Sequence, residues 1–202
     1  CWMGQSESVI DYCGMPKAAS YYEKNFFAPH LVVVTERNNE IAIGISNDTA
    51  DDTEYNVTYE FCNFDGEVIE SKELDVFVPA SSCRTVFNRN SPFGGKDTDK
   101  YVYVKICNAD GEILSQAIYQ KFSDKEIVYP KVKIDLTQCD STHFTVKANG
   151  FVKNVYLVCG DAVFSDNFFT LRKGEYKTVT TNIPVNESDI EIVTLNDLMQ
   201  ND

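Results

Sequence analysis

The sequence predicts a mostly β protein in which two small sandwich domains follow a short helical segment. The first observation is composition, because 13 Phe and 11 Tyr stand against one Trp and three Met, a bias that suits pleated, half-buried surfaces. The second is periodicity, since apolar and polar residues alternate with a period of two through most of the chain after residue 29. The third is the turn-forming residues that separate these runs. A chain of 202 residues has room for two such domains.

The helical segment lies near the N-terminus. Pro16 precedes the stretch KAASYYEKNFF, and proline suits the first turn of a helix. Ala18, Tyr22 and Phe26 recur at i, i+4 and i+8 and therefore share one face. We expect the helix to end before Pro29.

The first sandwich is predicted from about seven strands before residue 123. Asn38-Asn39 joins the first two strands, and Asp-Gly joins two later pairs, residues that tolerate the positive φ of tight hairpins. Short, evenly spaced strands without intervening helices predict an immunoglobulin-like sandwich over residues 28–125. The alternating apolar residues are Ile41, Ile43 and Ile45; Tyr55, Val57, Tyr59 and Phe61; Leu74, Val76 and Val78; and Val102, Val104 and Ile106.

Two kinds of connecting segment stand out in this region. Residues 62–69 read CNFDGEVI and residues 107–114 read CNADGEIL, a short repeat. Because Asp-Gly is what hairpin turns need, the repeat predicts two similar turns in preference to a paired ligand site. The segment 88–99, NRNSPFGGKDTD, carries glycine and charge without apolar periodicity and predicts an exposed loop.

The second sandwich is expected over residues 126–202, after a boundary at residues 123–130. Its small size suggests that its core leans on the first domain. Six strands are predicted, at 131–136, 142–149, 152–159, 167–171, 175–181 and 189–195.

The charge of the chain argues against two classes of partner. The net charge is −13 and the isoelectric point is near 4.5. Nucleic-acid phosphates and anionic lipids attract Lys and Arg, so we expect neither partner. No run approaches the roughly 20 apolar residues of a membrane-spanning helix.

The cysteines and the first residue bear on compartment and completeness. Seven Cys without a CxxC pair or a Cys/His cluster argue against zinc, and an odd number argues against a fully paired disulfide framework. Free thiols favour a cytoplasmic over a secreted setting. The chain begins at Cys1 without an initiator Met and reads like a piece of a longer polypeptide. We expect no cofactor and no metal.

A search for catalytic residues assigns none. His30 and His143 lie outside any nucleophile motif and are interpreted as strand-edge surface histidines. Asn38-Asn39-Glu40 resembles the Asn-Glu step that carries the general acid of some retaining glycosidases. Because two alternating runs flank it, a hairpin is the favoured interpretation.

Other polar motifs also have a structural interpretation. The run from Asn47 to Glu54 could offer oxygens to calcium but lacks the spacing of a calcium loop, so it predicts a solvated acidic loop. Asn47, Asn56 and Asn186 each start a glycosylation acceptor pattern, which chance explains in this Asn- and Thr-rich chain. Asp166-Asn167 is expected to order a turn from which Phe168 or Phe169 anchors the core, with stacking on a sugar ring as the alternative.

Two stretches together resemble a known family. The first runs from Cys1-Trp2 through Ser6, Ser8-Val9-Ile10-Asp11-Tyr12, Gly14, Pro16-Lys17 and Tyr21-Tyr22 to Phe27-Ala28-Pro29. It resembles the end of the catalytic barrel in β-mannosidases of glycoside hydrolase family 2. The second is Phe164-Ser165-Asp166-Asn167-Phe168-Phe169, followed by Leu171 and Gly174-Glu175. It is similar to the FSDNYFDL-x-PGE element of the last sandwich domain of that family, with Thr170 and Lys173 replacing Asp and Pro.

The resemblance implies a C-terminal region of a retaining β-mannosidase-like enzyme. Residues 1–27 would be the end of a (β/α)8 barrel, and both catalytic glutamates would lie on the barrel upstream, outside this chain. Trp2 would line the sugar pocket of the parent enzyme, where an indole face packs on a pyranose ring. The implied partners are the barrel of the same polypeptide and, through it, a β-mannoside.

Three functions follow from these considerations. The first is an accessory region that supports the barrel and is inactive alone. The second is a carbohydrate-binding module for manno-oligosaccharides, with an exposed Tyr101 or Tyr103, or aromatic residues of the loops, as its platform. The third is an interaction module that forms a homodimer of the parent through a sandwich face.

Overall fold

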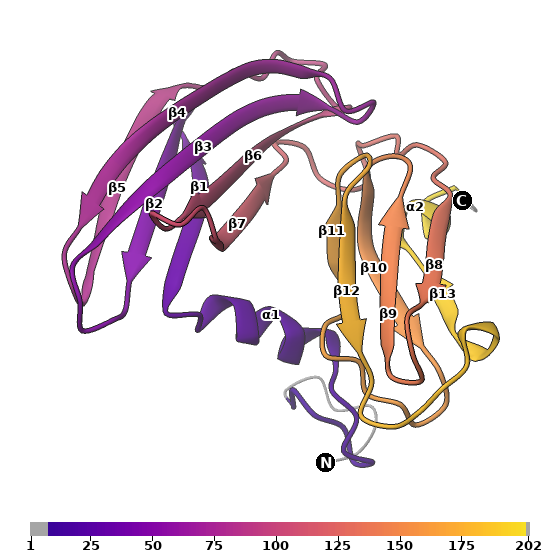
Figure 1. Ribbon diagram of the computed structural model, residues 1–202. Coiled ribbons are helices and arrows are strands. Elements are labelled where there is room, and N and C mark those ends of the chain that lie inside the picture. Colours follow the sequence, from indigo (N-terminus) through magenta and orange to yellow (C-terminus); the bar gives the residue numbers. More distant parts are fainter. Residues whose placement is uncertain (1–7, 201–202) are drawn as a thin grey trace. The chain divides into compact units, whose positions relative to one another are not determined.

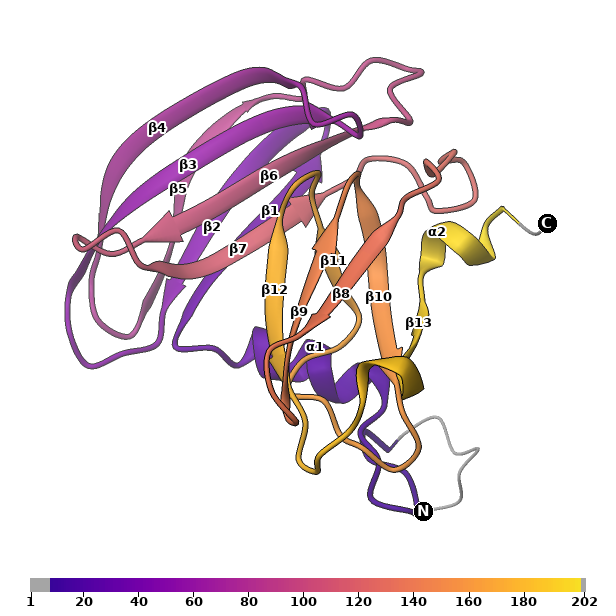
Figure 2. The ribbon, with the colours of Figure 1, turned by 45° about the vertical axis from the view of Figure 1, so that its right-hand side comes forward.

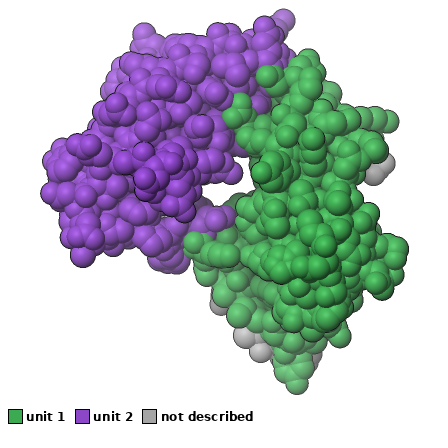
Figure 3. Space-filling view, viewed as in Figure 1, with its two compact units in different colours: residues 1–24, 64–66, 128–202 green, residues 25–63, 67–127 purple. Residues whose placement is uncertain are grey.

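The computed structural model describes residues 8–200, and strands dominate them (Figure 1). The chain divides into two compact units, which Figure 3 shows in different colours. Unit 2 holds residues 25–63 and 67–127, and unit 1 holds the chain up to Lys24, the segment Phe64–Gly66 and Val128 onward. Each unit contains two antiparallel sheets, which confirms the mostly β prediction. Within residues 8–200, no helix combines the length and apolar composition needed to cross a membrane.

Unit 2 is a sandwich of seven antiparallel strands, the number that the sequence predicts. One sheet has the order β1-β2-β5 and the other the order β4-β3-β6-β7. The strands are β1 (His30–Arg37), β2 (Glu40–Asn47), β3 (Thr53–Asn63), β4 (Val68–Val78), β5 (Ser82–Asn90), β6 (Lys100–Cys107) and β7 (Ile113–Tyr119).

The core of unit 2 lies between these sheets. Val57 and Tyr59 of β3 and Val104 of β6 are fully buried there, and the predicted alternating residues form most of the core. The intervening residues of β3, such as Asn56 and Thr58, face away from the core. One face of each central strand therefore builds the core, and the other is available for polar side chains.

The first hairpin has the geometry that its residues predict. Asn38 and Asn39 have φ angles of 52° and 62°, as a type I′ turn requires. Glu40 begins β2 opposite Arg37 and is exposed. The hairpin interpretation of Asn38-Asn39-Glu40 is confirmed.

The repeated segment forms two turns with the same hydrogen bonds. Asn63 Oδ1 accepts from the Glu67 amide at 2.9 Å, and Asn63 Nδ2 donates to the Glu67 carboxylate at 3.1 Å. Asn108 makes the same two bonds with Glu112, at 2.9 and 3.2 Å. Glycine follows the Asp in both turns, with φ of 84° and 80°. The prediction of two similar turns is therefore confirmed.

Two predicted solvated segments are more ordered than their polarity indicates. Phe93, in the loop after β5, is buried in the core with its ring centroid 5.1 Å from that of Phe61, so the exposed-loop prediction is wrong at this residue. Asn47 is 0% exposed, and its side-chain amide donates to the Asp51 carbonyl at 2.8 Å and the Val78 carbonyl at 3.2 Å. Asn47 therefore organises its loop as a hydrogen-bonding centre, and its buried amide is inaccessible to glycosylation.

A half-buried ion pair ties β1 to the segment after β7. Lys121 Nζ lies 2.8 Å from Glu36 Oε1, and the Tyr119 hydroxyl donates to Glu36 Oε2 at 3.2 Å. Burial tends to raise the pKa of Glu36, but the hydrogen bond and positive charge of Lys121, together with the hydrogen bond from Tyr119, hold that pKa below its ordinary value. Burial and the nearby negative charge of Glu36 raise the pKa of Tyr119 to about 12.

Unit 1 contains a second, smaller sandwich. Its sheets have the orders β11-β10-β13 and β12-β9-β8, and Figure 2 shows both layers. The strands are β8 (Ile134–Gln138), β9 (His143–Ala148), β10 (Val152–Val158), β11 (Phe169–Leu171), β12 (Tyr176–Thr180) and β13 (Glu191–Val193). The 3-10 helix Glu187–Asp189 and the helix α2 (Leu195–Leu198) complete this part. All six predicted strands are present, within a few residues at each end.

The Asp166–Phe169 segment fixes the start of β11 through side-chain hydrogen bonds. The buried Asn167 accepts from the Leu157 amide at 2.7 Å and donates to the Leu157 carbonyl at 2.9 Å. Asp166 accepts from the Asn167 amide and pairs with Lys177. Phe169 enters the core of this sandwich, as the structural interpretation predicts.

The helix α1 (Ala18–Phe26) is held by an aromatic cluster of unit 1. Tyr21 is its buried residue, at 8% exposure, and its hydroxyl donates to the Phe164 carbonyl at 3.2 Å. The Tyr21 ring lies 6.0 Å from that of Phe168, which stacks on Tyr156 at 4.7 Å. The spacing that predicted the helix places Ala18, Tyr22 and Phe26 on one face, but Tyr22 and Phe26 are exposed. The helix instead packs the adjacent face, which carries Tyr21, against the aromatic cluster.

The segment Phe64–Gly66 has its contacts within unit 1. Phe64 is buried, and its ring stacks at 4.5 Å on Phe151 and at 5.7 Å on Tyr129. Lys173 Nζ donates to the Asp65 carbonyl at 2.9 Å. This aromatic stack is the main packing contribution of the segment.

We predict that Glu36→Gln removes an acid-sensitive contribution to stability. Because the pKa of Glu36 is lowered on folding, its contribution is present above the unfolded pKa and lost as pH falls through the folded pKa. At neutral pH the variant should lose about 1–2 kcal/mol of unfolding free energy. Urea unfolding at pH 7 and at pH 3 should show this difference shrinking in acid. Glu40→Gln, an exposed change, is the control, and a difference that stays constant with pH would contradict the prediction.

We also predict that Phe168→Ala loosens α1 while the strands remain. Loss of this ring removes the contact of Tyr21 with its aromatic neighbours, which typically contributes about 1 kcal/mol beyond area burial. Amide hydrogen exchange of residues 18–24 should accelerate in the variant. The control is Phe27→Ala, because Phe27 is 83% exposed. Unchanged protection of α1 in Phe168→Ala would show that the cluster does not hold the helix.

Candidate functional site

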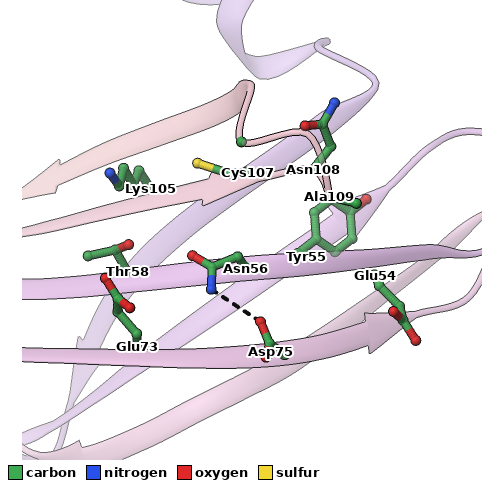
Figure 4. Close-up of a pocket in the computed structure, with 11 residues that line it drawn as sticks. Glu54, Tyr55, Asn56, Thr58, Glu73, Asp75, Lys105, Cys107, Asn108 and Ala109 are labelled. Atoms are coloured by element: carbon green, nitrogen blue, oxygen red, sulfur yellow. Dashed lines mark hydrogen bonds between the residues drawn. The ribbon is translucent and has the colours of Figure 1, made fainter.

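An open hollow lies on the outer face of strands β4, β3 and β6 of unit 2 (Figure 4). Its volume is about 620 Å³, within the range of small-ligand sites. Strands supply its floor and the second repeated turn supplies one rim. The lining residues are Glu54, Tyr55, Asn56, Thr58, Glu73, Asp75, Lys105, Cys107, Asn108, Ala109 and Gly111.

Strand register arranges the polar side chains in two rows. Thr58 of β3 is paired with Glu73 of β4 on one side and with Lys105 of β6 on the other. Adjacent strands are about 4.8 Å apart, so these three residues form a short row across the sheet. Asn56 begins the neighbouring row and donates to Asp75 Oδ1 at 3.1 Å.

Thr58 lies at the centre of this arrangement. It is only 5% exposed although it faces away from the core, because neighbouring strands carry longer side chains on both sides. Its hydroxyl has no hydrogen-bond partner among the residues that the structure describes. Glu73 and Lys105 likewise form no ion pair within residues 8–200.

The chemistry of the hollow suits binding more than bond cleavage. Glu54, Glu73 and Asp75 are exposed carboxylates, whereas a general acid needs surroundings that keep its proton at neutral pH. No group of three His, Cys, Asp or Glu is placed to hold a metal ion in the described part of the chain. The groups that line the hollow are therefore hydrogen-bond acceptors, hydrogen-bond donors and the ammonium group of Lys105. Together they form a surface suited to hydrogen bonding.

The two histidines have structural partners. His30 Nδ1 lies 2.7 Å from the Tyr55 hydroxyl, and the two rings meet edge to face. His143 Nδ1 lies 2.9 Å from Asp140, which also accepts from the His143 amide. Hydrogen bonds from the Thr142 amide and from His143 lower the pKa of Asp140 to about 2. Both histidines thus stabilise local structure.

Tyr101 and Tyr103 do not provide the sugar platform that the sequence predicted. They are 0% and 4% exposed, and the Tyr103 hydroxyl donates to Gln116 at 3.1 Å. Alternation correctly placed them on the outward face of β6, but their rings are covered there. Trp2, the predicted substrate contact of a parent enzyme, lies outside the described residues.

The sequence reasoning missed the row formed by Thr58, Glu73 and Lys105. Each residue occupies a polar position of an alternating run, which is the only signal of its outward orientation. Their proximity depends on the pairing of three strands from distant parts of the chain.

Comparison with protein families gives two adjacent matches. A model described as a mannosidase Ig/CBM-like domain matches residues 39–124. A model named for mannosidases and described as an Ig-fold domain matches residues 123–198. No curated protein matches the chain.

Solved enzymes share the fold over almost the whole chain. A β-D-mannosidase from Dictyoglomus thermophilum matches with a TM-score of 0.81 and 22% identity, over 94% of this chain and 24% of that enzyme. The exo-chitosanase CsxA from Amycolatopsis orientalis matches with a TM-score of 0.65 and 16% identity, over 94% of this chain and 28% of that enzyme. The chain therefore spans about a quarter of the length of these enzymes.

The family matches agree with the immunoglobulin-like sandwiches described above and with the second stretch of sequence resemblance, which begins at Phe164. Together they cover residues 39–198 and assign both sandwiches. The chain thus carries the immunoglobulin-like accessory domains of glycoside hydrolase family 2 enzymes, and it belongs to the C-terminal region of a mannosidase-like protein of that family.

Proposed function

We propose that the chain supports the catalytic barrel of a β-mannosidase-like enzyme and is inactive alone. The observation that carries the proposal is the mannosidase Ig/CBM-like match at residues 39–124, in the order expected beside the second Ig-fold domain. The barrel would belong to the same polypeptide, and the substrate would be a β-linked mannoside. Trp2 would contact that substrate in the parent enzyme.

Mannosidase-like activity is the favoured parent activity for a structural reason. The Dictyoglomus thermophilum enzyme shares the fold with a TM-score of 0.81, against 0.65 for the exo-chitosanase. The family resemblance of the sequence points the same way. A reducing, cytoplasmic setting is part of the proposal.

The packing of α1 supports the accessory role. Tyr21 and its aromatic partners attach the helix before β1 to the sandwich of unit 1. Any segment continuous with this helix is thereby anchored to that sandwich. A rigid attachment is what a supporting region needs, because a flexible linker would transmit no stability.

The expected result for this chain alone is no turnover of an aryl β-mannoside at any pH. The described residues offer exposed carboxylates but no protected acid paired with a nucleophile. Absorbance of the released phenol measures turnover, and the Dictyoglomus thermophilum enzyme is the positive control. Turnover that co-purifies with the chain would contradict the proposal.

The supporting role can be tested in the Dictyoglomus thermophilum enzyme. Deletion of its matching region should lower both its melting temperature and its β-mannosidase activity. A chimera that carries this chain in place of that region should recover part of both. Full stability and activity after the deletion would show that such a region gives no support.

A further inference from the structure

We propose that the polar hollow of unit 2 is a binding site for a hexopyranose unit that carries an amino group. The site lies on the surface of this chain and is complete within unit 2. The proposal therefore does not depend on the accessory role or on the activity of a parent enzyme.

The hydroxyl of Thr58 is the first argument. Thr58 as a whole residue is 5% exposed, and its hydroxyl has no partner within the described residues. That hydroxyl is not among the fully buried unpaired side-chain atoms of the described residues, so it is open to the hollow that Thr58 lines. A molecule bound there can replace water as its hydrogen-bond partner, and a polar group held at a fixed position in a largely covered site favours such a ligand.

The neighbours of Thr58 supply the second argument. Glu73 offers two acceptor oxygens on one side, and Lys105 offers three donor hydrogens on the other. Because neither group forms an ion pair within residues 8–200, both are available to a ligand. A row of acceptor, hydroxyl and donor about 10 Å long fits the several hydroxyl groups of a sugar ring.

Charge selects among sugars. Glu54, Glu73 and Asp75 line the hollow together with a single lysine, Lys105, so the hollow carries a surplus of negative charge. Asp75 accepts from Asn56 through Oδ1, which leaves Oδ2 and the Glu73 carboxylate toward the ligand. An ammonium substituent is attracted to these oxygens, whereas the carboxylate of a uronic acid is repelled.

Binding is expected to be weak and sensitive to salt. Tyr55, the aromatic residue among those that line the hollow, is 1% exposed and offers no free face for stacking. Hydrogen bonds and exposed charges must then carry the interaction. Such contacts support millimolar affinity, and the charged part weakens as ionic strength rises.

The test is a titration of the isotope-labelled chain, followed by amide chemical shifts in NMR spectra. The probes are the methyl β-glycosides of glucosamine, mannose and glucuronic acid. Glucosamine should bind most tightly, mannose more weakly and glucuronic acid not measurably. Shift changes should centre on Thr58, Lys105 and the turn from Asn108 to Gly111.

Variants make the test specific. Thr58→Val keeps the shape of the side chain and should weaken binding of the glucosamine and mannose glycosides about 5-fold, the effect of one hydrogen bond. Glu73→Gln should reduce the preference for glucosamine over mannose by a similar factor. Thr85→Val, at an exposed position of β5, is the matched control and should change neither. Lys105→Met gives a second test of the row if Thr58→Val fails to fold.

Three results would overturn the proposal. The first is the absence of shifts at the hollow with every probe at tens of millimolar. The second is mannose binding at least as tight as glucosamine binding. The third is affinity that remains unchanged in folded Thr58→Val and Lys105→Met variants.

Discussion

The central strands of unit 2 can bury only one face in the core between the two sheets. Val57 and Tyr59 of β3 and Val104 of β6 occupy that face, so the residues between them must point outward. Antiparallel pairing then sets Thr58 between Glu73 and Lys105. The apolar core therefore fixes which polar groups meet on the outer surface, and the hollow is a direct consequence of how the sandwich is stabilised.

Short sequence patterns predicted most of the fold, because a strand with one buried face and a tight turn each depend on residues that are adjacent in the chain. The alternation of Tyr55, Val57 and Tyr59 predicts that β3 has one buried face. Asn38-Asn39 predicts the type of turn that joins β1 to β2. Side-chain neighbours across strands depend on pairing between distant segments, which alternation does not contain. For this reason alternation is compatible with the outward orientation of Thr58 and Lys105 but does not show that they lie side by side.

Burial was harder to predict than element type. Tyr101 and Tyr103 occupy outward positions of a strand yet are covered, and Phe93 leaves a polar loop to enter the core. In α1, helical spacing fitted Tyr22 and Phe26, but the aromatic partner at Phe168 selects Tyr21. Periodicity describes which residues share a face, whereas long-range partners determine which face is covered.

In the two similar turns at residues 62–69 and 107–114, the residues that hold the turn together differ from the residue that contacts the surroundings. In each turn an Asn and a Glu side chain close the loop, so the backbone does not rely on the residue after the Asn. That residue is the buried Phe64 in one turn and the exposed Ala109 in the other, where it lines the hollow. Position 109 is thus open to variation, and sequence change there can reshape the rim of the hollow while the hairpin keeps its form.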